Sequence, residues 1–96
     1  MPTKEVIEST MKNHFESWNA KDKDRWIANW DENVVMYDPV GGPDKQGIAA
    51  LEDTWENSFK DGHSWKIEPV FMQICEDQAA LHVKNYGICL LYTSDA

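Results

Sequence analysis

Asp38 is the side chain best placed for acid–base chemistry, because it ends a predicted strand over residues 34–38. In a strand it shares a pleat face with Val34 and Met36, so its carboxylate is expected among apolar neighbours. Burial there would raise the pKa of the carboxyl and strengthen it as a base near neutral pH. The alternative is structural, since an aspartate followed by Pro39 also opens turns.

Histidines supply the next candidate groups. His14 lies on the apolar stripe of a predicted helix, where a neutral imidazole can donate a hydrogen bond and a protonated one adds charge, or where the ring is simply part of the core. His82 alternates with Leu81 and Val83, so it faces either a pocket or solvent. The three histidines lack the close spacing of metal ligands, and we expect neither a metal nor a cofactor.

Five tryptophans fall mostly on inward stripes. They are either core residues or the flat walls of a pocket, and such walls suit flat apolar ligands. We therefore predict a pocket that takes a small apolar or aromatic ligand. Its expected lining is Trp18, Trp30, Val34, Met36, Trp55, Phe59 and His82.

The elements that must position these side chains begin with helices. Thr3 can cap a first helix, and Asp22 or Asp24 a second, short one. A third helix is predicted after Gly47 and ends at residues 60–62. The apolar positions of the first helix are Ile7, Met11, Phe15 and Trp18; the second carries Trp26, Ile27 and Trp30; the third carries Ile48, Leu51, Trp55 and Phe59.

Strands are predicted where the apolar period changes to two. Besides residues 34–38, which precede a loop over residues 40–44, a strand starts at Ser64 with Trp65, Ile67 and Phe71 on one face. Pro69 interrupts it and indicates an edge or a bulge. After a turn at residues 76–78, a last strand covers residues 79–88. The order of helices followed by a meander indicates the α+β class.

Length and charge limit the function. A chain of 96 residues forms one domain, and its net charge of −8 repels phosphate backbones and anionic lipid, so we expect neither a nucleic-acid nor a membrane partner. No apolar run is long enough for a membrane span, and we expect no signal peptide, because the patterned segment starts within the first residues. Cys75 and Cys89 show no metal or redox spacing. We expect a cytoplasmic protein.

The segments V-V-M-Y-D-P-V-G-G-P at residues 34–43, with Gly47-Ile48 after it, and F-E-S-W-N-A-K-D at residues 15–22 resemble the nuclear-transport-factor-2-like superfamily. Within it, the sequence is most similar to SnoaL-like proteins and ketosteroid isomerases. The resemblance implies a cone-shaped, curved antiparallel or mixed sheet packed against three helices. It also implies a homodimer for the full-length protein.

The same resemblance implies roles for two residues. Asp38 matches the aspartate that shuttles a proton between carbons of an enolisable ketone in ketosteroid isomerases. His14 falls at the position of the tyrosine that hydrogen-bonds the substrate oxyanion. The tyrosines that support that residue correspond to Trp30 and Trp55, which can donate but cannot accept a hydrogen bond, so the hydroxyl chain of the family is not reproduced.

Two functions follow as hypotheses. The first is a small-molecule enzyme of the isomerase or cyclase type, with Asp38 as general base and His14 as the group that polarises the carbonyl. The second is a non-catalytic ligand-binding or dimerisation module of the same fold. The superfamily holds both kinds of protein, so the resemblance alone does not choose between them.

We interpret the tail at residues 89–96 as a segment of different origin from the rest of the chain. Its eight residues match a translated transposase sequencing adapter, so we expect a partial SnoaL-like domain at residues 1–88 and a non-native tail. Later strands of the family would then be missing, including the one that carries its second acidic oxyanion donor. The alternative is a genuine terminal strand, because Leu90, Leu91 and Tyr92 are good strand formers.

Overall fold

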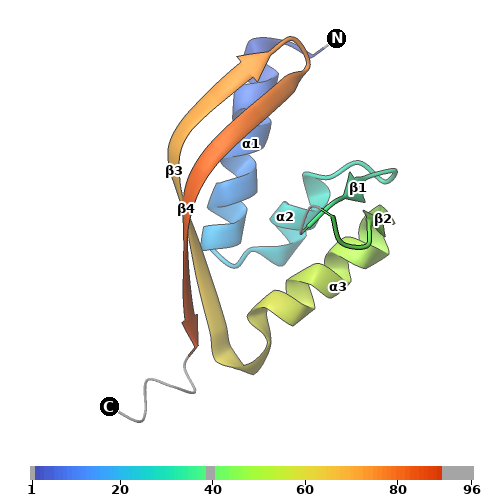
Figure 1. Ribbon diagram of the computed structural model, residues 1–96, viewed down its shortest axis with the longest axis vertical. Helices are drawn as coiled ribbons and strands as arrows, with labels where there is room; N and C mark the ends of the chain where they lie inside the picture. Colours follow the sequence, from blue (N-terminus) through green and yellow to red (C-terminus); the bar gives the residue numbers. More distant parts are fainter. Residues whose placement is uncertain (1, 39–40, 90–96) are drawn as a thin grey trace.

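The computed structural model describes residues 2–38 and 41–89 and shows an α+β fold (Figure 1). A long hairpin lies against α1, while α2 and a short two-stranded ribbon lie to one side of it. From this ribbon α3 runs back to the start of the hairpin. The elements are α1 (Lys4–Asn19), α2 (Lys23–Ala28), β1 (Val35–Met36), β2 (Lys45–Gln46), α3 (Gly47–Phe59), η1 (Lys60–Gly62), β3 (His63–Cys75) and β4 (Gln78–Cys89).

The helix ends follow the predicted caps. Thr3 Oγ1 accepts a hydrogen bond from the Val6 N–H at 3.2 Å, and Asp22 Oδ1 accepts one from the Arg25 N–H at 3.2 Å. Each side chain satisfies a backbone N–H that has no partner within its helix. After α3, Asp61 adopts a left-handed backbone conformation with φ of 58°, which ends the helix at the predicted place.

A cluster of aromatic rings forms the core between α2 and α3. Trp26, Leu51 and Trp55 are 2%, 0% and 6% exposed. The rings of Trp26 and Trp55 lie 5.4 Å apart, and those of Trp55 and Phe59 lie 4.4 Å apart, both at tilted angles that aromatic pairs favour. Partly buried residues surround this centre: Trp18, Ile27, Trp30, Val34, Met36, Ile48 and Phe59.

The predicted strand over residues 34–38 is shorter in the structure. Only Val35 and Met36 join a ladder, and they pair antiparallel with Gln46 and Lys45 of β2. The sequence did not predict β2, because two residues carry no detectable period. The Gly47 N–H donates to the Val34 carbonyl at 2.8 Å, so the first residue of α3 is fixed beside β1.

A bulge at Val70 reverses the faces of β3. Pro69 pairs with Val83 and Phe71 with His82, which leaves Val70 without a partner in the register. The irregularity predicted at Pro69 is therefore confirmed, but the shared face predicted for Phe71, Trp65 and Ile67 was wrong. Phe71 is 56% exposed on the opposite face.

The inner face of the hairpin packs on the helices. Beyond the bulge it continues through Met72 and Ile74, which are half-buried. The side chain of Asn19, at the end of α1, bonds the edge of β3 twice: its Nδ2 donates to the Ile67 carbonyl at 2.8 Å, and its Oδ1 accepts from the Ile67 N–H at 2.6 Å. One side chain thus replaces a strand neighbour and attaches the hairpin to α1.

Candidate functional site

His14 and Asp38 line the same cavity, although they come from different elements. The cavity has a volume of about 250 Å³ and lies between the helices and the inner face of the hairpin. Elements from both ends of the chain contribute to its wall, so the fold is what brings these side chains together. The lining residues are His14, Trp18, Trp26, Met36, Asp38, Thr54, Ser58, Trp65, Ile67 and Asn85.

The imidazole of His14 is packed among tryptophan rings. Its ring centroid lies 5.7 Å from that of Trp30, edge to face, and 6.4 Å from that of Trp26. Burial lowers the pKa of His14 below its usual value of 6.5, because the surroundings disfavour the charged form. The His14 carbonyl accepts a hydrogen bond from Ser17 Oγ at 3.2 Å, a contact that does not involve the ring. A neutral imidazole therefore presents one donor and one acceptor to a ligand.

Asp38 differs from the sequence expectation in its exposure. It lies two residues beyond the end of β1, and its side chain is exposed rather than buried among apolar neighbours. Asp38 also borders a second cavity of about 460 Å³, together with Lys45 and Asp53. The ladder ends at Met36, so Asp38 lies outside it, and this exposed residue lines the cavity.

Polar groups of α3 contribute hydrogen-bond acceptors to the wall. Thr54 Oγ1 donates to the Ala50 carbonyl at 3.0 Å, and Ser58 Oγ donates to the Thr54 carbonyl at 2.8 Å. Their protons are thus engaged by the helix backbone, and the oxygen lone pairs remain available. Neither residue is predicted from the sequence, although their spacing of four places them on one helix face.

Other lining residues were also missed. The sequence pattern puts Trp65 and Ile67 on one inward face, and this pattern could have identified them as wall residues. Asn85 carried no such signal, since it reaches the cavity only because β4 pairs with β3, where it lies opposite Ile67.

The predicted wall residues divide into two groups. The structure places Trp18 and Met36 in the wall of the cavity. Trp30 instead lines a smaller pocket of about 160 Å³ on another side of His14. Val34, Trp55 and Phe59 pack in or against the aromatic core and are not among the residues that line this cavity, so their place in a ligand site stays a prediction.

His82 is the remaining correction. It is exposed on the outer face of the hairpin, where its ring meets that of Phe71 edge to face at 6.4 Å. Side chains do alternate between the two faces of β4, but Leu81 and Val83 are the residues that face the helices. His82 therefore does not line the cavity that contains His14 and Asp38.

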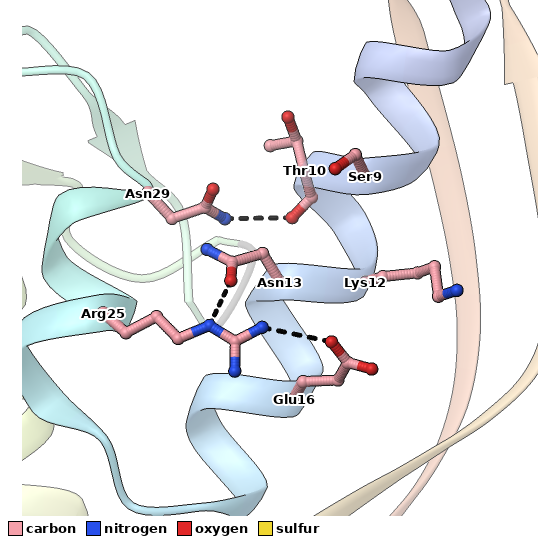
Figure 2. Close-up of a pocket in the computed structure, with 7 residues that line it drawn as sticks. All are labelled: Ser9, Thr10, Lys12, Asn13, Glu16, Arg25 and Asn29. Carbon is pink, nitrogen blue, oxygen red and sulfur yellow. Dashed lines mark hydrogen bonds and ion pairs between the residues drawn. The ribbon is translucent and has the colours of Figure 1, made fainter.

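A polar groove of about 340 Å³ between α1 and α2 is already occupied by contacts within the protein (Figure 2). Arg25 Nη2 donates to Glu16 Oε1 at 3.1 Å, and Arg25 Nε donates to Asn13 Oδ1. Asn29 Nδ2 donates to the Thr10 carbonyl at 2.9 Å. These bonds join the two helices, and we interpret the groove as a structural contact.

Two further findings concern metal binding and membrane insertion. In the part of the chain that the structure describes, no three His, Cys, Asp or Glu side chains gather closely enough to hold a metal ion. Among its helices, none combines the length and the apolar character needed to cross a membrane.

The fold is that of a SnoaL-like protein. The SnoaL-like domain family matches residues 11–94, and the chain therefore belongs to this family. The expected relation to the nuclear-transport-factor-2-like superfamily is confirmed. The matched range includes residues 89–94, so the predicted non-native origin of the tail stays a prediction, and residues 90–96 lie outside the described residues.

Solved structures agree on the fold. The chain is similar to a protein from Sinorhizobium meliloti provisionally assigned as a polyketide cyclase, with 23% identity and a TM-score of 0.73 over 82% of this chain and 70% of that one. It is also similar to a domain of unknown function with a cystatin-like fold from Nostoc punctiforme, with 16% identity and a TM-score of 0.59 over 92% of this chain and 58% of that one. No curated protein matches the chain.

Proposed function

We propose that this protein is a small-molecule enzyme of the isomerase or cyclase type that acts on an enolisable, apolar or aromatic ketone. The observation that carries the proposal is that His14 and Asp38 line one cavity whose wall also contains three tryptophan rings. Membership of the SnoaL-like family and the likeness to the Sinorhizobium protein support this class of reaction.

Asp38 is the general base in this proposal. Its carboxylate removes a proton from the carbon next to the substrate carbonyl, and the electron pair moves onto the carbonyl oxygen to form an enolate. Returning the proton to another carbon gives an isomer. Attack of the enolate carbon on a second carbonyl of the same molecule instead closes a ring, and the alkoxide formed on that carbonyl takes the proton back from Asp38. Both outcomes start from the same proton transfer, which a positioned base accelerates by about 10²–10⁴-fold.

His14 stabilises the enolate. Because burial lowers the pKa of His14, its imidazole is neutral near pH 7 and donates a hydrogen bond to the enolate oxygen without transferring charge. A donor held in place by the rings of Trp26 and Trp30 needs no reorganisation when the negative charge develops.

A second function is favoured by one observation. Asp38 is exposed, so the cavity can also serve a non-catalytic module that binds a flat apolar ligand. That module would bind the same ligands through the aromatic wall, but it would not accelerate proton transfer. Proton exchange therefore separates the two functions, whereas binding alone does not.

The test is the exchange of the α-protons of a flat ketone, 2-tetralone, followed by NMR in D₂O. We expect the chain to accelerate exchange, and Asp38→Asn to reduce the rate about 100-fold or more. Asp44→Asn is the matched control: this exposed carboxylate accepts a bond from Gln46 Nε2 outside the cavity, and its loss should leave the rate unchanged. Exchange no faster than in buffer, with 2-tetralone still bound, would favour the binding module.

Location and assembly complete the proposal. We infer a cytoplasmic protein, because the two cysteines, Cys75 and Cys89, show neither metal-ligand nor redox spacing. A homodimer is supported by the exposed apolar side chains on the outer face of the hairpin: Val70, Phe71 and Tyr86.

A further inference from the structure

Gly87 lies directly beneath the ring of Trp65. The two residues are partners across β3 and β4. A Cβ atom added at Gly87 would lie 2.8 Å from Trp65 Cε3 and 2.9 Å from Trp65 Cη2, with Cζ3 closer still. Carbon atoms do not approach this closely without a shift, so only glycine leaves room for the ring in its present place.

The opposite edge of the same ring is held by a hydrogen bond. Trp65 Nε1 donates to the Ser58 carbonyl at 2.6 Å, in the last turn of α3. That carbonyl has no partner within the helix, because the helix ends one residue later. The indole is thus fixed between the backbone of β4 and the end of α3.

Trp65 is also a shared wall of the two neighbouring cavities. It lines the cavity that contains His14 and Asp38, and it lines the larger cavity that Asp38 also borders. A side chain at position 87 would move the indole off the sheet. Such a movement changes the shape of the wall beside Asp38 and stretches the bond to Ser58.

We infer that Gly87 is a positioning residue that sets the shape of the ligand site through Trp65. This inference takes the kind of ligand, a flat aromatic molecule, from the proposed function. Gly87 itself does not line the cavity, but it determines how well that ligand fits. Neither the sequence pattern nor the family resemblance pointed to Gly87.

The test uses Gly87→Ala in the full chain with two readouts. The first needs no ligand: the Trp65 indole proton, identified by its loss in Trp65→Leu, should exchange slowly with solvent in the wild type and faster in Gly87→Ala. The second is the affinity for 2-naphthol, which should fall about tenfold or more, as expected when the shape of an apolar pocket changes. Lys84→Ala, on the outer face of the same strand, is the matched control and should change neither readout.

A double-mutant cycle shows whether Gly87 acts through Trp65. In the Trp65→Leu background, Gly87→Ala should have no further effect on 2-naphthol binding. If Gly87→Ala alone fails to fold, the double variant should fold as well as Trp65→Leu does, because the clash is gone.

Three results would overturn the inference. The first is an exchange rate of the Trp65 indole proton that Gly87→Ala leaves unchanged. The second is a loss of 2-naphthol affinity on Gly87→Ala that is equally large in the wild-type and Trp65→Leu backgrounds. The third is a double variant that unfolds although Trp65→Leu folds. A wild-type chain that binds no 2-naphthol counts against the proposed ligand. If Gly87→Ala still accelerates the exchange of the Trp65 indole proton with solvent in that case, the positioning role is supported.

Discussion

The helical part and the hairpin of this protein bury their side chains to very different extents. In the helical part, Trp26 and Leu51 are 2% and 0% exposed, whereas on the outer face of the hairpin Phe71 and Tyr86 are 56% and 47% exposed. The fully buried apolar side chains therefore lie in the helical part, and the hairpin supplies one wall of a cavity. The candidate site lies at the boundary between them, where His14 comes from the helical part and Trp65 from the hairpin.

Removing the centre of the core is expected to have the largest effect. Leu51→Ala should lower the free energy of unfolding by about 2–5 kcal/mol, because it deletes a fully buried side chain and leaves a cavity. The measurement is urea denaturation followed by tryptophan fluorescence. Phe71→Ala, on the exposed face, is the matched control and should change stability by only about 0.5 kcal/mol. Similar losses for the two variants would contradict the difference between the regions.

Breaking the contact that attaches the hairpin to the helical part should have an intermediate effect on stability. Asn19→Ala removes both hydrogen bonds to the Ile67 backbone, at about 0.5–1.5 kcal/mol each, and should cost about 1–3 kcal/mol. Hydrogen exchange at the Ile67 amide should accelerate, while exchange in α3 should not. Asn19→Asp keeps the acceptor and loses the donor, so its effect should be smaller. An Ile67 amide that stays protected in Asn19→Ala would show that the hairpin does not depend on this side chain.

The burial of His14 should produce a smaller, pH-dependent effect. Its pKa is lowered in the folded state, so below pH 6.5 the unfolded chain binds more protons than the folded one. The contribution of His14 to stability is complete above its unfolded pKa and declines as the pH falls toward the folded pKa. As the pH falls through this range, the denaturation midpoint of the wild type should decrease, and that of His14→Phe should decrease less. Identical pH profiles would contradict the burial of the ring.

The outer face of the hairpin should affect association more than stability. Val70, Phe71 and Tyr86 form exposed apolar surface on this hairpin, and such surface favours self-association. We expect residues 1–96 to associate in size-exclusion chromatography with light scattering, and Phe71→Lys to shift the chain toward the monomer with little change in unfolding. A sharp wild-type monomer peak with cooperative unfolding would refute this prediction.

The sequence predicted all three helices from apolar spacing, and for the first two a capping side chain gave a second signal. Thr3 and Asp22 are caps whose side chains bond the first backbone N–H groups, and apolar spacings of three and four marked the buried faces. The hairpin carried a weaker signal, since a single bulge at Val70 reverses the face of every later residue. This is why Phe71 was misplaced although Pro69 had indicated the irregularity.

The site was predictable only in part, because its wall is assembled by tertiary contacts. The family resemblance singled out His14 and Asp38, and the structure brings both to one cavity. The exposure of Asp38 was missed because the predicted strand continued two residues beyond the real ladder. Gly87 was missed because its role depends on the Trp65 ring across the sheet, which no spacing within one segment reveals.

One titration tests the central claim most directly, that the cavity between His14 and Asp38 is the ligand site. 2-Naphthol is added to the wild-type chain while NMR follows the Met36 methyl group and the His14 ring, with the Ala79 methyl group near the hairpin turn as an internal control. We predict that the Met36 and His14 signals shift with one common Kd while the Ala79 signal stays in place, and that His14→Phe weakens binding about three- to tenfold through the lost hydrogen bond. Unchanged Met36 and His14 signals, or equal affinity in His14→Phe, would contradict the account.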